Sequence, residues 1–97
     1  MFARVTVVQA SPEKVDAGIE SFNSQVIPAV KSVDGYKGAL LLIDRSAGKG
    51  IGITLWESED ARQRGAEAVD EARSATIAAM GATAPPVDNY EVAVSDL

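Results

Sequence analysis

Residues 51–60 of the chain, IGITLWESED, join the end of a strand to the beginning of a helix. Positions 51, 53 and 55 are isoleucine, isoleucine and leucine, and this period-two spacing is typical of a strand with one apolar face. Ser58 is a favourable N-cap, and the two acids directly after it suit the positive end of a helix dipole. Trp56, the only tryptophan, stands at the junction. The segment therefore predicts a strand-to-helix connection from which the neighbouring elements can be placed.

The helix that begins at Ser58 is predicted to run to about Met80, because Gly81 offers a left-handed exit. One side of this helix is charged, whereas the other is dry and mostly small. The dry side consists of Ala61, Gly65, Val69, Ala72, Thr76 and Met80. Small residues let a helix lie close to a sheet, or leave room for a ligand. After the connector Ala84–Pro86, residues 90–95 alternate between apolar and polar or small side chains, which predicts a last strand.

Toward the N-terminus, residues 38–45 are apolar on both parities, so both faces of this predicted strand should be buried. Residues 46–50 form a hairpin loop between it and the next strand. Residues 2–10 alternate and predict the first strand, with one apolar and one mixed face. Ser11 and a following proline begin a helix that extends to about Val33. Pro28 cannot donate a helical hydrogen bond, so a kink or short break is expected over 24–28.

The resulting order β-α-β-β-α-β is the ferredoxin-like, split βαβ pattern of an α+β fold, and residues 1–97 form one domain. By analogy with that fold, an antiparallel four-stranded sheet in the order 4-1-3-2 carries both helices on one face. The second strand then lies at an edge, and its second apolar face would meet water in a monomer. We therefore predict a homodimer whose sheets pack face to face into an α/β barrel. The alternative is that a terminal segment covers this edge. Arg4 is expected to face the dimer barrel and to pair with a carboxylate there.

Composition excludes several kinds of site. The chain has no cysteine, which excludes disulfides, thiol nucleophiles and thiolate metal sites. It has no histidine, which removes the commonest general base and metal ligand. A net charge of −5 without a basic cluster gives no electrostatic support for nucleic-acid binding. Neither a signal peptide nor a membrane-spanning segment is evident, so we expect a cytoplasmic protein with no membrane partner.

With these elements placed, the chain resembles the dimeric α/β-barrel superfamily, and within it the antibiotic-biosynthesis-monooxygenase-like branch. The resemblance covers nearly the whole chain. It rests on Met1–Gln9 as the first strand, Pro28 in the first helix, the connection Asp34–Gly38, the segment Leu55–Ser58 that closes the third strand, and Tyr90–Val92 in the last strand.

The resemblance implies activity on small molecules. Members include oxygenases that act on polyphenolic or quinol-like aromatics without a cofactor, haem-degrading proteins, isomerases and proteins without an established role. The haem-degrading members share an asparagine, a tryptophan and a histidine. This chain has Trp56 and Asn23 but no histidine, so histidine-dependent haem degradation is not expected. The leading hypothesis is a monooxygenase-like enzyme that uses no metal or flavin and acts on small aromatic molecules. The alternative is a non-catalytic dimer that binds a small apolar ligand or serves as a stress-related accessory protein.

A ligand pocket is expected between the sheet and the helices, and no catalytic residue is assigned. The candidates for its lining are Trp56, Asn23, Arg73, Tyr36 and Tyr90. Trp56 could form a pocket wall, or anchor the core or the dimer interface. Asn23 could bond a ligand oxygen or a backbone carbonyl freed at the kink. Arg73 lies about 40° from Val69 around its helix, on the dry side. It could neutralise a ligand carboxylate or enolate, or it could extend past the sheet edge or pair with Asp70. The two tyrosines could donate a proton or stack on an aromatic ring, or be structural.

Overall fold

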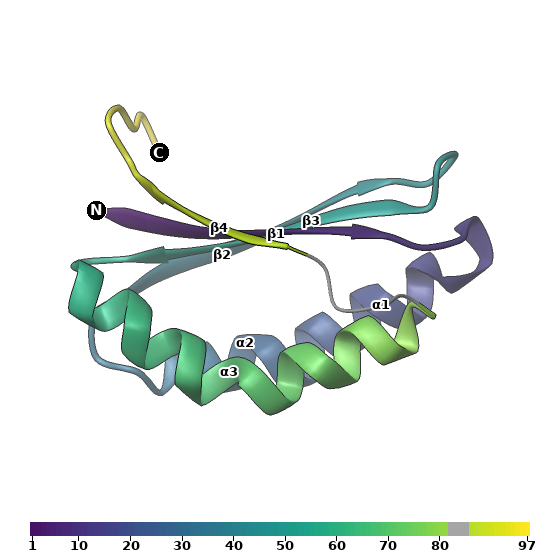
Figure 1. Ribbon diagram of the computed structural model, residues 1–97, viewed down its shortest axis with the longest axis horizontal. Helices are drawn as coiled ribbons and strands as arrows, with labels where there is room; N and C mark the ends of the chain where they lie inside the picture. The colour runs from purple at the N-terminus through teal and green to yellow at the C-terminus, as the bar shows by residue number, and fades with distance from the viewer. Residues whose placement is uncertain (82–85) are drawn as a thin grey trace.

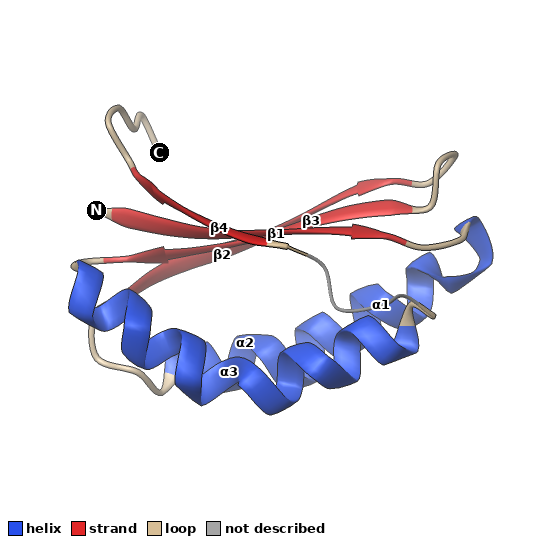
Figure 2. Ribbon diagram, viewed as in Figure 1, coloured by secondary structure: helices blue, strands red, loops and turns tan. Residues whose placement is uncertain are grey.

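The computed structural model describes residues 1–81 and 86–97. Its strands form one sheet in the order β2-β3-β1-β4, and each neighbouring pair is antiparallel. The helices lie against one face of this sheet and leave the other face open (Figure 1, Figure 2). The predicted ferredoxin-like fold and its strand order are therefore confirmed. The strands are β1 (Phe2–Gln9), β2 (Tyr36–Asp44), β3 (Lys49–Trp56) and β4 (Val87–Glu91).

The first helical segment changes its winding along its length. A short 3-10 turn, η1 (Pro12–Lys14), leads into α1 (Val15–Ser21), the π-helical turn η2 (Phe22–Val26) and α2 (Ile27–Lys31). The interruption predicted over 24–28 is thus a π-helical turn, which ends just before the proline that cannot donate. At the start of the segment, the Ser11 side chain makes no capping hydrogen bond, although its carbonyl accepts one from the Lys14 N–H at 3.0 Å.

Several predicted boundaries were wrong, and the pairing of the strands explains why. β2 begins at Tyr36 instead of Gly38, because Tyr36 already pairs with Trp56 across a β-bulge. β4 spans 87–91 instead of 90–95, because its pairing with β1 runs from Val87 opposite Thr6 to Glu91 opposite Phe2. The first helical segment ends at Lys31, two residues before its predicted end. Most of the predicted Ala84–Pro86 connector lies outside the described residues.

The helix α3 (Glu59–Ala79) begins and ends as predicted. The Ser58 Oγ accepts a hydrogen bond from the Ala61 N–H at 3.1 Å, and Gly81 has a φ of +68°. α3 packs over the sheet so closely at Gly65 that a Cβ there would lie 2.8 Å from Cε2 of Trp56. Trp56 is therefore fully buried, in a core cluster with Val26, Val30, Ala61 and Val69. A second cluster includes Ile77, which the predicted dry face of this helix omitted.

The uncovered face of the sheet is apolar. On β2, Leu40 and Leu42 are 44% and 48% exposed, and Tyr90 of β4 is 55% exposed. The segment after β4 rises on this open side (Figure 1). Within residues 1–81 and 86–97, no helix is long and apolar enough to cross a bilayer.

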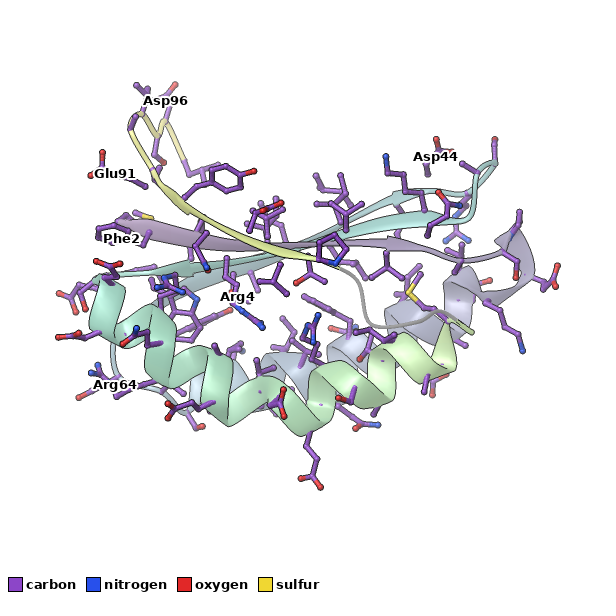
Figure 3. All side chains as sticks on the ribbon, in the orientation of Figure 1. Phe2, Arg4, Asp44, Arg64, Glu91 and Asp96 are labelled. Atoms are coloured by element: carbon purple, nitrogen blue, oxygen red, sulfur yellow. The ribbon has the colours of Figure 1, made fainter. Side chains whose placement is uncertain are left out.

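Arg4 was predicted on the wrong face. It projects from β1 toward the helices, where Figure 3 shows its side chain between the two layers, and not toward the open face. The reason is that Ala3, Val5 and Val7 supply the apolar open face of β1, which leaves the alternate parity for the helix side. On that side, Arg4 pairs with the small residue Thr54 of β3, so a long side chain has space.

Candidate ligand cavity between the sheet and the helices

A partly open cavity of about 60 Å³ lies between the sheet and the helices. This exceeds the roughly 10–15 Å³ that one water molecule needs, so the cavity has room for a small organic group. Its walls come from β1, β2, β3, η2 and α3. Most of its lining is aliphatic, aromatic or glycine, and the polar exceptions are Arg4, Arg73, Thr6, Thr54 and Thr76.

Two glycines on β3 create much of this space. Gly50 and Gly52 occupy the helix-facing parity of the strand, where a larger side chain would fill the cavity. A Cβ at Gly52 would lie 3.5 Å from Cε2 of Phe22, and one at Gly50 would lie 3.5 Å from Cε of Met80. On the opposite wall, the π-helical turn η2 brings both Phe22 and Val26 into the lining. Such turns recur at functional sites in helices.

Arg4 and Arg73 bring two positive charges to the cavity, although the chain as a whole is acidic. Burial lowers the pKa of the Arg4 guanidinium, the positive charges of Arg73 and Arg62 lower it further, and only Asp70 acts in the opposite direction. Within residues 1–81 and 86–97, Arg4 forms no hydrogen bond or ion pair. A half-buried cation without such a partner is costly, and a bound anion would offset that cost.

Arg62 lies outside the lining but acts on the charge of Arg4, and it forms an ion pair with Glu59 at 3.8 Å. Its side chain is only 12% exposed, and its Nη1 donates to Oδ1 of Asn89 at 2.8 Å. Asn89 is the β4 partner of Arg4 in the ladder, so this bond links α3 to the edge strand beside Arg4. In the part of the chain that the structure describes, no group of three or more acidic side chains is placed to hold a metal ion.

The buried hydroxyls beside the arginines belong to two hydrogen-bonded pairs. Nε1 of Trp56 donates to Oγ1 of Thr54 at 2.9 Å. Thr76 is bonded twice: its Oγ1 lies 2.8 Å from Oγ of Ser21, and it donates to the Ala72 carbonyl at 3.1 Å. Both threonines are 8% exposed, so their orientation is fixed by these partners rather than by solvent.

Of the five residues predicted to line a pocket, Arg73 lies in the wall of this cavity. Trp56 lies behind the wall in the core and reaches the cavity only through its bond to Thr54. Tyr36 packs edge-on against the Trp56 ring, with centroids 5.8 Å apart and an interplanar angle of 71°, so it supports that ring. Both aromatic residues sit at the end of the sheet where α3 approaches most closely.

The other two candidates lie on outer surfaces. Asn23 is exposed on η2, whereas Phe22 and Val26, which are four residues apart, face the cavity. Tyr90 shares a face with its ladder partner Ala3, and it is therefore on the open side of the sheet. Neither belongs to the described lining of the cavity.

Sequence reasoning missed Arg4 and Thr54 as site residues. A signal was present, because Gly50, Gly52 and Thr54 share one parity of β3, and such small residues mark the face over which space remains. Residues that are paired in the ladder share a face of the sheet, so this parity of β3 also identifies the helix-facing residues of β1. Arg4 is one of them, and it therefore lies in the cavity.

Comparison with known proteins supports the fold but not an activity. No protein-family model matches the chain. The uncharacterized protein Rv2557 of Mycobacterium tuberculosis is 36% identical over 93 residues, which is 96% of this chain and 41% of that protein. The chain thus spans about two fifths of the length of the curated relatives it matches.

Two solved structures share the architecture over nearly the whole chain. The first is a monooxygenase from the gene ActVA-Orf6 of Streptomyces coelicolor, in complex with nanaomycin D. The comparison with this monooxygenase gives a TM-score of 0.78 at 17% sequence identity. It covers 99% of this chain and 90% of the monooxygenase chain. The second is SnoaB, a cofactor-independent oxygenase of Streptomyces nogalater. The comparison with SnoaB gives a TM-score of 0.70 at 13% sequence identity. It covers 98% of this chain and 95% of the SnoaB chain. This chain therefore has the fold of the antibiotic-biosynthesis-monooxygenase-like proteins, as its sequence resemblance predicted.

Proposed function

We propose that the protein binds a small, mainly apolar molecule through one anionic oxygen held at Arg4 and Arg73, and promotes its oxidation by O2 without metal or flavin. The observation that supports binding most directly is the placement of two arginines, with three threonines, in a cavity whose lining is mostly apolar. The support for oxidation is the shared fold with a monooxygenase and a cofactor-independent oxygenase. The volume of about 60 Å³ favours a small ligand, since pockets for drug-sized ligands commonly enclose about 300–1,000 Å³.

The arginines would contribute by stabilising the substrate anion. Two guanidinium groups beside a phenol lower its pKa, so that a larger fraction is phenolate near neutral pH. The carbon para to the phenolate oxygen then forms a bond to O2, and the resulting peroxide takes a proton. Loss of the hydrogen on that carbon as a proton, with cleavage of the O–O bond, leaves a quinone carbonyl and one water. The substrate loses four electrons, and O2 gains them.

A non-catalytic ligand-binding role is the second candidate, and one observation favours it. Among the described residues that line the cavity there is no carboxylate, tyrosine or histidine that could accept a proton. Proton removal would then depend on water and on the acidity of the substrate. A protein that only binds its ligand has no need of such a group.

Binding and turnover are tested separately. Calorimetric titration with benzoate and with its neutral analogue benzamide measures the charge requirement, and oxygen uptake with hydroquinones, phenols and anthrone measures turnover. Arg4→Met and Arg73→Met should each weaken benzoate binding about 10- to 100-fold, because a hydrogen bond to a charged group contributes about 1.5–3 kcal/mol. Benzamide binding should change by less than about threefold.

The outcomes separate the two candidates. Oxygen uptake that exceeds the uncatalysed rate and falls in both arginine variants supports an oxygenase. Benzoate binding without any uptake across the panel supports the non-catalytic role. Equal affinity of the wild type for benzoate and benzamide would refute the anion-binding proposal itself.

We also propose that the open face of the sheet is covered by a second copy of the chain. Leu40, Leu42 and Tyr90 expose large apolar side chains on the open face of the sheet, which single proteins seldom leave uncovered. Leu40→Lys should shift the sedimentation coefficient from dimer to monomer. Gln63→Lys adds the same charge at an exposed position of α3 and should leave the dimer intact. A wild-type protein that sediments as a monomer at micromolar concentration would refute this arrangement.

A further inference from the structure

The bond between Trp56 and Thr54 fixes the direction of a buried hydroxyl. An indole Nε1–H can only donate, so Oγ1 of Thr54 must be the acceptor in the 2.9 Å contact. The hydroxyl hydrogen of Thr54 is therefore directed elsewhere. Among the described residues, Thr54 donates no side-chain hydrogen bond, although it is only 8% exposed. A buried donor without an acceptor costs about 1–3 kcal/mol, which makes it a candidate for bonding to a ligand.

This donor and the Arg4 side chain belong to the same wall of the cavity. Arg4 and Thr54 are direct partners in the β1–β3 ladder, and both line the cavity. Side chains paired in this way have Cβ atoms about 4.5–5.5 Å apart on one face of the sheet. One ligand oxygen between them could therefore accept from both the guanidinium and the hydroxyl. Thr76, the other buried threonine of the lining, differs because its hydroxyl already donates to the Ala72 carbonyl.

We infer that Thr54 is a ligand-positioning residue: its hydroxyl donates to the same anionic oxygen that Arg4 holds, and Trp56 fixes the direction of that hydroxyl. This role rests on the proposed binding function. It gives the only tryptophan a part in the site without contact with the ligand, because the Trp56 ring lies behind the cavity wall. The site would then prefer an oxygen that accepts two hydrogen bonds, such as a carboxylate, phenolate or enolate oxygen, over an amino group.

Three variants separate this role from a merely structural one. Thr54→Ser keeps the hydroxyl, Thr54→Val replaces it by a methyl group of similar size, and Trp56→Phe removes the indole donor. Affinities for benzoate and for toluene, which fills an apolar cavity but accepts no hydrogen bond, are measured by calorimetry. In the wild type and the threonine variants, the single indole N–H resonance of Trp56 reports whether its bond to position 54 persists.

Thr54→Ser should bind benzoate within about threefold of the wild type, whereas Thr54→Val should bind it about 10- to 100-fold more weakly. Trp56→Phe should cause a smaller loss of about two- to fivefold, because the hydroxyl remains but is free to rotate. Toluene affinity should stay within about twofold in all three variants.

The results distinguish failure of the inference from failure of the proposed function. If the wild type binds benzoate and Thr54→Val binds it equally well, the inference is wrong and the anion site stands. If Thr54→Val weakens benzoate and toluene alike, the residue is structural and the inference is again wrong. If the wild type does not bind benzoate, the proposed function fails and the inference fails with it.

Discussion

Gly65 offers a sharp test of how α3 packs on the sheet. In an exposed helix, replacing glycine by alanine stabilises the helix by about 1 kcal/mol, because alanine loses less backbone entropy. At Gly65, however, the new methyl group would overlap the Trp56 ring, with a separation of only 2.8 Å from Cε2. The tryptophan is fully buried and held by its bond to Thr54, so it has little room to move.

The overlap should outweigh the gain in helix propensity. Overpacking in a tight core commonly costs about 1–3 kcal/mol, and a rigid ring places the cost toward the upper end. After the gain of about 1 kcal/mol is subtracted, we expect Gly65→Ala to lower the free energy of unfolding by about 1–2 kcal/mol. For a chain of this size the Tm should fall by roughly 5–15 °C. Thermal and urea unfolding followed by circular dichroism, at one fixed protein concentration, measure both quantities.

Gly18→Ala is the matched control. Gly18 also lies inside a helix, α1, and its added methyl group would meet Met80, with the Sδ atom 2.7 Å away. The Met80 side chain is flexible and can adopt another rotamer, whereas the indole ring cannot. Met80 is also buried and its Cγ would be the nearest atom, so we expect a loss of stability in Gly18→Ala that is smaller than in Gly65→Ala. A Gly65→Ala protein as stable as the wild type, or more stable, would refute the packing described for α3 and Trp56.

Three further substitutions test other parts of the structure. Gly52→Ala adds a methyl group in ordinary contact with Phe22, so it should reduce benzoate affinity at least fivefold in calorimetry while the urea midpoint remains nearly unchanged. Ser58→Ala removes the capping bond to the Ala61 N–H and should lower the free energy of unfolding by about 1 kcal/mol, measured by urea denaturation. Gly48→Ala places a side chain at a φ of +66° in the β2–β3 turn and should lower the Tm by several degrees, as thermal unfolding would show.

The order of the elements could be predicted because it depends on local signals. Alternation marked the strands, Ser58 and Gly81 marked the ends of the long helix, and Pro28 located the irregular turn in the first helical segment. These signals act over one to four residues, so a single sequence contains them. The boundaries at Tyr36 and at the end of β4 were missed because they depend on which residues the partner strands offer for pairing.

The functional residues could be identified only partly. Arg73 was found because its position on the dry side of a helix follows from helical periodicity alone. Asn23 and Tyr90 were chosen by residue type, and the structure places both on outer surfaces. Arg4 was assigned to the opposite face of the sheet, since alternation states which residues share a face but not which face the helices cover.

The sequence by itself determined the elements, their order and the small-residue face of α3, because each follows from the local geometry of one segment. The tertiary structure alone decided that Arg4 and Thr54 meet, that Trp56 acts from behind the cavity wall, and that two glycines leave a cavity beneath the helices. The reason is that each of these depends on the register between strands and on which face the crossing helices bury. The pairing of Arg4 with Thr54, for example, joins residues about 50 positions apart in the chain, and the pattern within one segment does not encode it.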